Sequence, residues 1–246
     1  MGLRLRQLAF AVEDLASSVS QLERWLGLAV AYRDPGVATY GLENAVFPIG
    51  DQFIELLSPK QGGTSAGRYI ARRGGDCGYM AIFQSPDARV EHERITKLGV
   101  RVIEEIAIGS YTSWHYHPSD VGGVLLSVDS SADPASWMPA GDDWRSAVRT
   151  DRVSGLAAVE IGSPDPSKLA ARWQELLGVP RRGNVLELDD AEVRFVDSEG
   201  RGAGIEAFAV HATAHGAILE AAARDGMHED TLRFAGARLR LEGRLS

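Results

Sequence analysis

Two histidines one residue apart, His115 and His117, are the first candidates for chemistry in this chain. They belong to the stretch WHYHPSDVGGVLLSVD, residues 114–129, which places an aromatic residue on each side of His115. Histidine titrates near neutral pH and is the commonest side-chain ligand for metals. In a regular strand the two imidazoles would share one face, roughly 6–7 Å apart. The stretch therefore indicates an acid–base pair or part of a metal site. The alternative is that His117 only braces the turn before Pro118.

Glu55, in the apolar segment FIELL, is the second candidate. Burying a lone carboxylate is costly, so Glu55 must face water or a polar partner. Strand alternation places it on the same face as Phe53 and Leu57. On a concave face Glu55 would be a general base or a single metal ligand. On an open face it would only hydrogen-bond to the backbone or to an arginine.

The elements that must position these residues begin with a strand over residues 7–12. A helix follows, from the N-cap candidate Asp14 to Gly27, where a helix of this kind would stop. Extended segments at 30–32 and 43–47 and a further strand at 52–57 complete a strand–helix–strand–strand–strand order. Residues 60–76 are rich in Gly, Arg and Lys and are predicted to be a surface connection.

The same order then recurs along the chain. A second unit starts with a strand at 79–83 and ends in the stretch that contains His115. Its last two strands, YHPSDVGGVLLSV, can be laid over VFPIGDQFIELL of the first unit. Third and fourth units are predicted from residues 155 and 205 onward, the fourth being the shortest. Such an internal repeat determines architecture more firmly than local propensity does.

This pattern resembles the vicinal-oxygen-chelate (VOC) superfamily, which includes glyoxalase I, methylmalonyl-CoA epimerase, extradiol dioxygenases and bleomycin-resistance proteins. The segments QLAFAVEDLASSVSQLERWLGL, NAVFPIGDQFIELLSP and HPSDVGGVLLSVD carry the resemblance over residues 5–130. It implies an α+β fold of paired βαβββ modules, with curved, cupped mixed sheets and helices outside. We accordingly expect a domain of two modules over residues 1–131, a linker over 132–152 and a second, reduced domain over 153–246.

The resemblance also implies positions for metal ligands, near the start of each first strand and the middle of each last strand. In the first two units these positions hold Gln7, Glu55, Tyr79 and Ser127. Only Glu55 is a strong ligand, and zinc or iron prefers several His, Cys or carboxylate groups. We therefore predict that the usual metal site is lost and that no cofactor is bound; a divalent metal is the open alternative, although it would meet an incomplete ligand set. Gln7, Tyr79 and Ser127, together with Asn44, are instead expected to line a ligand-binding site.

Composition limits the classes of partner. The formal charge is −8 with both signs interspersed, which disfavours nucleic acid as a partner. No run of apolar residues is long enough to cross a membrane. The single cysteine, Cys77, fits a reducing cytoplasm. We expect a small-molecule ligand or substrate, and a homodimer is an open alternative to a monomer.

Three functions fit these observations. The first is a glyoxalase-like enzyme, a lyase or isomerase or a dioxygenase-like member of the superfamily, with Glu55 as base assisted by His115 or His117. The second is a non-catalytic, drug-sequestering protein that binds a small molecule on the concave sheet. The third is a degenerate scaffold that mainly dimerises.

Overall fold

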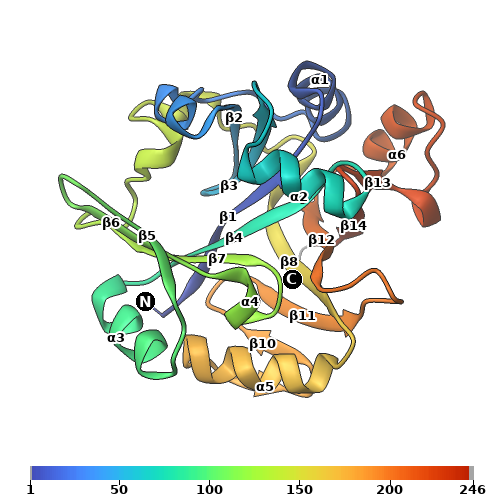
Figure 1. Ribbon diagram of the computed structural model, residues 1–246. Helices are drawn as coiled ribbons and strands as arrows, with labels where there is room; N and C mark the ends of the chain where they lie inside the picture. Colours follow the sequence, from blue (N-terminus) through green and yellow to red (C-terminus); the bar gives the residue numbers. More distant parts are fainter. Residues whose placement is uncertain (1, 244–246) are drawn as a thin grey trace.

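We describe residues 2–243 from a computed structural model (Figure 1). The first half contains, in order, β1 (Arg4–Ala11), α1 (Leu15–Leu26), the 3-10 helix η1 (Pro35–Tyr40), β2 (Leu42–Ile49), β3 (Gln52–Pro59), α2 (Ser65–Arg73), β4 (Cys77–Gln84), α3 (Ala88–Lys97), β5 (Val102–Ile108), β6 (Tyr111–Tyr116), α4 (Pro118–Val121) and β7 (Leu125–Ser130).

The second half follows two 3-10 helices in the connecting segment, η2 (Met138–Ala140) and η3 (Trp144–Ala147). It contains β8 (Val153–Ser163), α5 (Pro166–Leu177), β9 (Arg181–Arg182), β10 (Val185–Glu187), β11 (Glu192–Asp197), β12 (Gly204–Ala212), α6 (His215–Ala223), η4 (Glu229–Thr231), β13 (Arg233–Phe234) and β14 (Ala237–Glu242).

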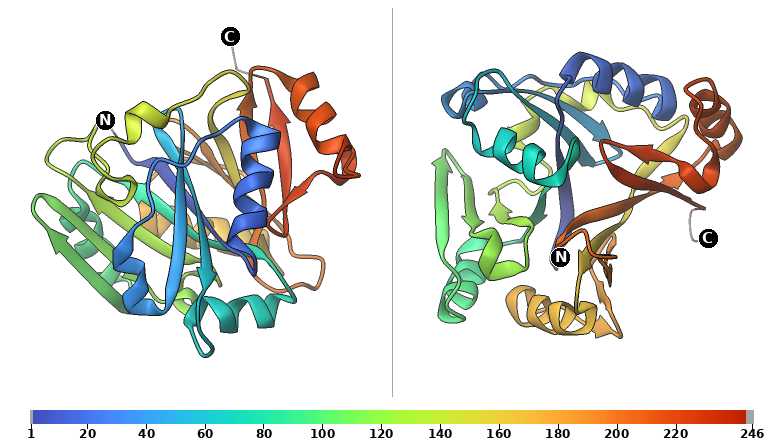
Figure 2. Two further views of the ribbon diagram at one scale, coloured as in Figure 1. Left: turned by 90° about the horizontal axis from the view of Figure 1, so that it is seen from above. Right: turned by 45° about the vertical axis from the view of Figure 1, so that its right-hand side comes forward.

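Strands β1 and β4 form the centre of the sheet in the first half. β1 runs parallel to β3 and antiparallel to β4, and β2 pairs with the outer edge of β3. On the other side β7 runs parallel to β4 and is followed by β6 and β5. The sheet is strongly curved (Figure 2). The predicted α+β class with a curved mixed sheet is confirmed.

The second half repeats this mixed pairing on a smaller scale. β8 lies between the parallel strand β11 and the antiparallel strand β12, and β14 runs parallel to β12. A single residue pair, Ile205 with Gly78, joins β12 to β4 and makes one 14-stranded sheet. The division at residues 132–152 into two domains stays a prediction.

Alternation along β1 separates two apolar layers. Leu8 and Phe10 point into the larger core, which also contains Trp25 of α1 and Trp173 of α5. Ala9 and Ala11 point to the opposite, concave face with a smaller apolar cluster. The larger core is continuous between the halves, and the rings of Phe10 and Phe208 lie 5.0 Å apart.

Local signals set the ends of the first helix as predicted. The side chain of Asp14 accepts a hydrogen bond from Ser17 N, and Gly27 adopts the left-handed conformation with φ of 67°. Six side chains of α1 are buried at helical spacing: Leu15, Ser18, Val19, Leu22, Trp25 and Leu26.

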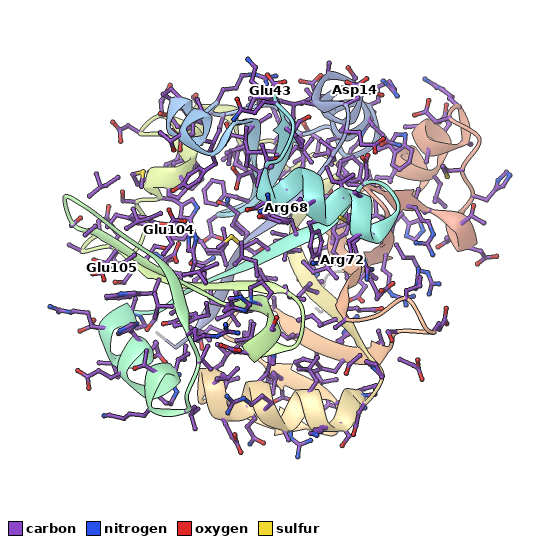
Figure 3. The ribbon with its side chains drawn as sticks, in the orientation of Figure 1. Asp14, Glu43, Arg68, Arg72, Glu104 and Glu105 are labelled. Atoms are coloured by element: carbon purple, nitrogen blue, oxygen red, sulfur yellow. The ribbon has the colours of Figure 1, made fainter. Side chains whose placement is uncertain are left out.

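Residues 60–76 are not merely a surface connection, and that prediction is wrong. Thr64 caps a helix, α2, whose residues Ala66, Tyr69 and Ile70 are buried in the smaller cluster on the concave face. The exposed residues Arg68 and Arg72 occupy the other side of the helix (Figure 3). Tertiary burial of three residues therefore stabilises a helix of mainly polar composition.

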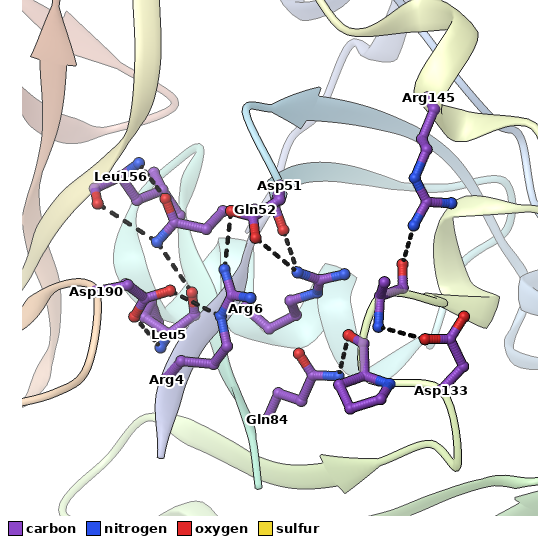
Figure 4. A network of polar contacts seen from close by, with 12 residues as sticks. Arg4, Leu5, Arg6, Asp51, Gln52, Gln84, Asp133, Arg145, Leu156 and Asp190 are labelled. Atoms are coloured by element: carbon purple, nitrogen blue, oxygen red, sulfur yellow. Dashed lines mark hydrogen bonds and ion pairs between the residues drawn. The ribbon is translucent and has the colours of Figure 1, made fainter. Parts of the chain in front are cut away.

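Polar side chains also hold the N-terminal strand to the second half (Figure 4). Gln52 donates from Nε2 to Leu5 O at 3.0 Å and accepts from Leu156 N at 2.7 Å. Arg4 donates from Nε to a carboxylate oxygen of Asp190 at 2.8 Å. Gln52 and Arg4 are buried and Asp190 is partly buried, so the two halves are fixed against each other by satisfied polar contacts.

Candidate functional site

Glu55 lies on the concave face of β3, between Phe53 and Leu57 as alternation predicted. It is 9% exposed. Its two carboxylate oxygens accept hydrogen bonds from Gln7 Nε2 at 2.8 Å and from Asn44 Nδ2 at 2.7 Å. No lysine or arginine of residues 2–243 forms an ion pair with it. Glu55 is thus a buried carboxylate that is held by neutral amides.

Each of these two amides is itself fixed by a donor on its oxygen. Gln7 Oε1 accepts from the indole Nε1 of Trp137 at 2.7 Å. Asn44 Oδ1 accepts from the backbone N of Asp34 at 2.7 Å. Because an indole N–H and a backbone N–H can only donate, both amide groups must turn their nitrogen toward Glu55. The structure therefore brings together Gln7, Asn44 and Glu55, all three of which the sequence placed at a site.

Burial in this position changes the proton affinity of Glu55. Desolvation raises the pKa of its carboxyl from 4.5 to about 7, against the opposing effect of the bonds from Asn44 and Gln7. The carboxyl is consequently divided between its protonated and ionised forms near neutral pH.

His115 lies on the same concave face, on β6. Its Nδ1 is 3.1 Å from Oε2 of Glu104 on β5, and Tyr40 donates from its hydroxyl to the other oxygen of Glu104. The hydrogen bond from His115 is the main reason why the pKa of Glu104 is lowered. A protonated His115 is close enough for its charge to lower the pKa of Glu55 as well. Trp114 and Tyr116 point to the opposite face, into the core, as expected.

A second buried carboxylate, Asp129 on β7, was missed from the sequence. It is 1% exposed and accepts hydrogen bonds from Tyr111 at 2.5 Å, from Ser113 at 2.7 Å and from Ser127. Burial raises its pKa, although His115 and these hydroxyls act in the opposite direction. Ser127 therefore serves as a partner of Asp129. Strand alternation could have predicted Asp129 at the site, because it lies two residues after Ser127 and shares its strand face.

His117 does not share the strand face of His115, and that prediction is wrong. β6 ends at Tyr116, and His117 is the N-cap of α4. Its Nδ1 accepts a hydrogen bond from Ser119 N at 3.2 Å and lies 3.2 Å from Arg101 Nη2. Pro118 after His117 removes a ladder donor and starts the helical turn. The structure thus gives His117 the turn-bracing position that was its alternative.

Tyr79 is partly buried and packs against the smaller apolar cluster on the concave face. Its ring packs edge-on against Tyr69 of α2, with centroids 5.5 Å apart. A register shift between Ala9 and Phe10, opposite Met80 and Gly78, accompanies this placement. Burial raises the pKa of the Tyr79 hydroxyl, so this group remains a neutral donor.

Residues 8–177 match a family model described as glyoxalase-like domain. The chain belongs to this glyoxalase-like family of the VOC superfamily. No curated protein matches the sequence.

Solved structures similar to this glyoxalase-like protein include methylmalonyl-CoA epimerases. A variant from Streptomyces coelicolor in complex with 2-nitronate-propionyl-CoA has 25% identity and a TM-score of 0.47, over 52% of this chain and 97% of that one. The enzyme from Mycobacterium tuberculosis has 21% identity and a TM-score of 0.46, over 52% of this chain and 87% of that one.

The metal site that the superfamily implies does not fit the residues of this glyoxalase-like protein. Gln7 has only its oxygen available as a ligand, and that oxygen accepts from Trp137. Ser127 is bonded within the Asp129 cluster, and Tyr79 packs against Tyr69. Nowhere in residues 2–243 do three His, Cys, Asp or Glu side chains converge as a metal site would require. We therefore assign no chemical step to a metal.

A surface cavity of about 240 Å³ borders the Glu55 site. Its walls come from η1 and the edge strand β2 and include Asn44, whose amide donates to Glu55. The remaining lining residues are Arg33, Asp34, Pro35, Ala38, Leu42, Glu43 and Lys60.

Within residues 2–243, no helix has the length and apolar character needed to span a bilayer.

Proposed function

We propose that the concave face of the first half is the active site of an isomerase or lyase that acts on a small organic molecule. In this proposal Glu55 removes a proton from a carbon next to a carbonyl group. The single observation that carries it is the environment of Glu55, a buried carboxylate held by two amides instead of a cation. A cation would suppress the basicity of the carboxylate, whereas burial raises its pKa to about 7. A general base works best when its pKa is near the operating pH.

His115 is the proposed partner for the returning proton or for the developing enolate oxygen. Glu104 accepts at Nδ1, which fixes the ring and places the neutral form's remaining lone pair on Nε2. In its protonated form His115 lowers the pKa of both Glu55 and Asp129, so it lies within electrostatic range of the two buried carboxyls. A proton that leaves one side of a carbon could therefore return from a different group. This arrangement supports an isomerase over a simple hydrolase.

A non-catalytic binding protein is the second candidate, favoured by the surface cavity beside Asn44. Its walls combine the apolar side chains of Pro35, Ala38 and Leu42 with a few charged groups. Apolar walls with a few polar groups are typical of small-molecule sites. In that case Glu55 would accept a hydrogen bond from the ligand without abstracting a proton.

Hydrogen–deuterium exchange at carbon separates these candidates without knowledge of the product. The protein would be incubated in D2O with small ketones, aldehydes and acyl thioesters that carry an acidic α-proton, and deuterium incorporation followed by NMR. We expect exchange with at least one compound, and its loss in Glu55→Gln. Glu23→Gln is the matched control, since Glu23 is an exposed acid on α1 and does not line the cavity beside Asn44. Compounds that raise the melting temperature but exchange no proton would overturn the enzyme and support the binding protein.

A further inference from the structure

The segment between the two halves contributes a side chain to the Glu55 site. Trp137 is 1% exposed and lies on the concave face of the first half, although it is 130 residues from Gln7 in the chain. Its indole N–H donates to Gln7 Oε1 at 2.7 Å, and Gln7 Nε2 donates to Glu55 at 2.8 Å. Three groups are thus linked in one direction, from indole to amide to carboxylate.

The backbone of β1 explains why Trp137 can reach this position. A register shift between Leu5 and Gln7 turns Arg6 to the same side as Gln7. The Arg6 guanidinium lies 5.1 Å from the centroid of Phe53, 5.2 Å from Trp137 and 5.9 Å from Trp144. The contact with Arg6 and the stacking on Phe53 fix the Trp137 ring while its indole N–H donates to Gln7.

We propose that Trp137 is a positioning residue for the base, because it fixes the orientation of the Gln7 amide that holds Glu55. Without an indole donor, the buried Gln7 oxygen would lose its partner and the amide could rotate by half a turn. A rotated amide would direct its oxygen at the carboxylate and repel the ionised form. The connecting segment is thereby part of the site and more than a tether.

This inference rests on the proposed role of Glu55, but its test does not require a known substrate. The Glu55 carboxyl carbon would be titrated by NMR in protein labelled with 13C-glutamate. In Trp137→Phe, which keeps an aromatic ring but removes the N–H, we expect the titration midpoint of Glu55 to rise by about 0.5–1 pH unit, the effect of one lost hydrogen bond. Trp144→Phe is the matched control, since Trp144 packs edge-on against Phe53 at 5.0 Å and is expected to leave the midpoint unchanged.

The Gln7→Met variant provides an independent test of whether Trp137 acts through Gln7. If Trp137 acts through Gln7, the double variant Gln7→Met/Trp137→Phe has the same midpoint as Gln7→Met alone. Equal midpoints in Trp137→Phe and Trp144→Phe, or fully additive effects of the Gln7 and Trp137 changes, would overturn the inference. A wild-type midpoint near the ordinary 4.5 would instead refute the proposed base itself, so the two failures are distinguishable. Near-ultraviolet circular dichroism establishes that each variant is folded.

Discussion

His115 Nδ1 lies 3.1 Å from Oε2 of Glu104, on two strands that pair directly. In the same register, His115 is opposite Ser127 on its other side. The contact with Glu104 therefore orients the imidazole of His115 on the concave face, next to the strand that carries Ser127 and Asp129.

This contact makes Glu104 a reporter of the His115 orientation. In His115→Asn we expect the pKa of Glu104, now lowered mainly by the hydrogen bond from His115, to return toward its ordinary range. A 13C titration of Glu104 would measure the change. Tyr40→Phe removes the other donor to Glu104 and should give a smaller rise. If His115→Asn leaves the titration of Glu104 where it is, the two side chains do not interact in solution.

The free energy of unfolding should depend on pH because of Glu55. Its pKa is raised in the folded state, so the native protein binds this proton more tightly than the unfolded chain does. The resulting contribution to the free energy of unfolding is largest below about pH 4.5 and declines as pH rises to about 7.

Urea unfolding at pH 5.5 and pH 8 measures this contribution. We expect wild type to lose about 2 kcal/mol more than Glu55→Gln over that interval, from 1.36 kcal/mol for each pH unit between the two pKa values. Glu43→Gln, which changes an exposed acid, should behave as wild type. A pH dependence in Glu55→Gln that equals that of wild type would contradict the raised pKa.

His117 should matter for the turn and not for the proposed site. His117→Ala removes the acceptor for Ser119 N, and we expect a loss of about 0.5–1 kcal/mol in the free energy of unfolding. Asparagine is a good N-cap residue, so His117→Asn should retain most of the stability. In both variants the titration midpoint of Glu55 should equal that of wild type. A shifted midpoint would show that His117 does contribute to the Glu55 site.

The contact between the halves depends on the absence of a side chain at Gly78. A Cβ atom there would lie 2.4 Å from Cβ of Ile205, which cannot move without the strand. We expect Gly78→Ala to destabilise the fold by roughly 1–3 kcal/mol, measured by urea unfolding. Gly216→Ala in α6, where a Cβ meets nothing within 4 Å, should be neutral or slightly stabilising. Should Gly78→Ala prove as stable as Gly216→Ala, β4 and β12 would not be packed as described.

Strand periodicity predicted much of the first half. It also predicted the face of Glu55, because every second residue of a strand lies on one face and Phe53 and Leu57 flank Glu55 at that spacing. Gln7 and Asn44 were expected at the site, but their bonds to Glu55 depend on strand register, which side-chain pattern alone does not specify. Nothing local indicates which surface a tryptophan in a polar connecting segment will cover, so Trp137 could not be assigned to Gln7.

The most direct test of the central claim is the titration of the Glu55 carboxyl carbon in the wild-type protein by 13C NMR. The site as described predicts a midpoint of about 7, because burial outweighs the hydrogen bonds from Asn44 and Gln7. A midpoint near 4.5, the ordinary value for a glutamate, would show that the carboxylate is hydrated and would contradict its role as a base.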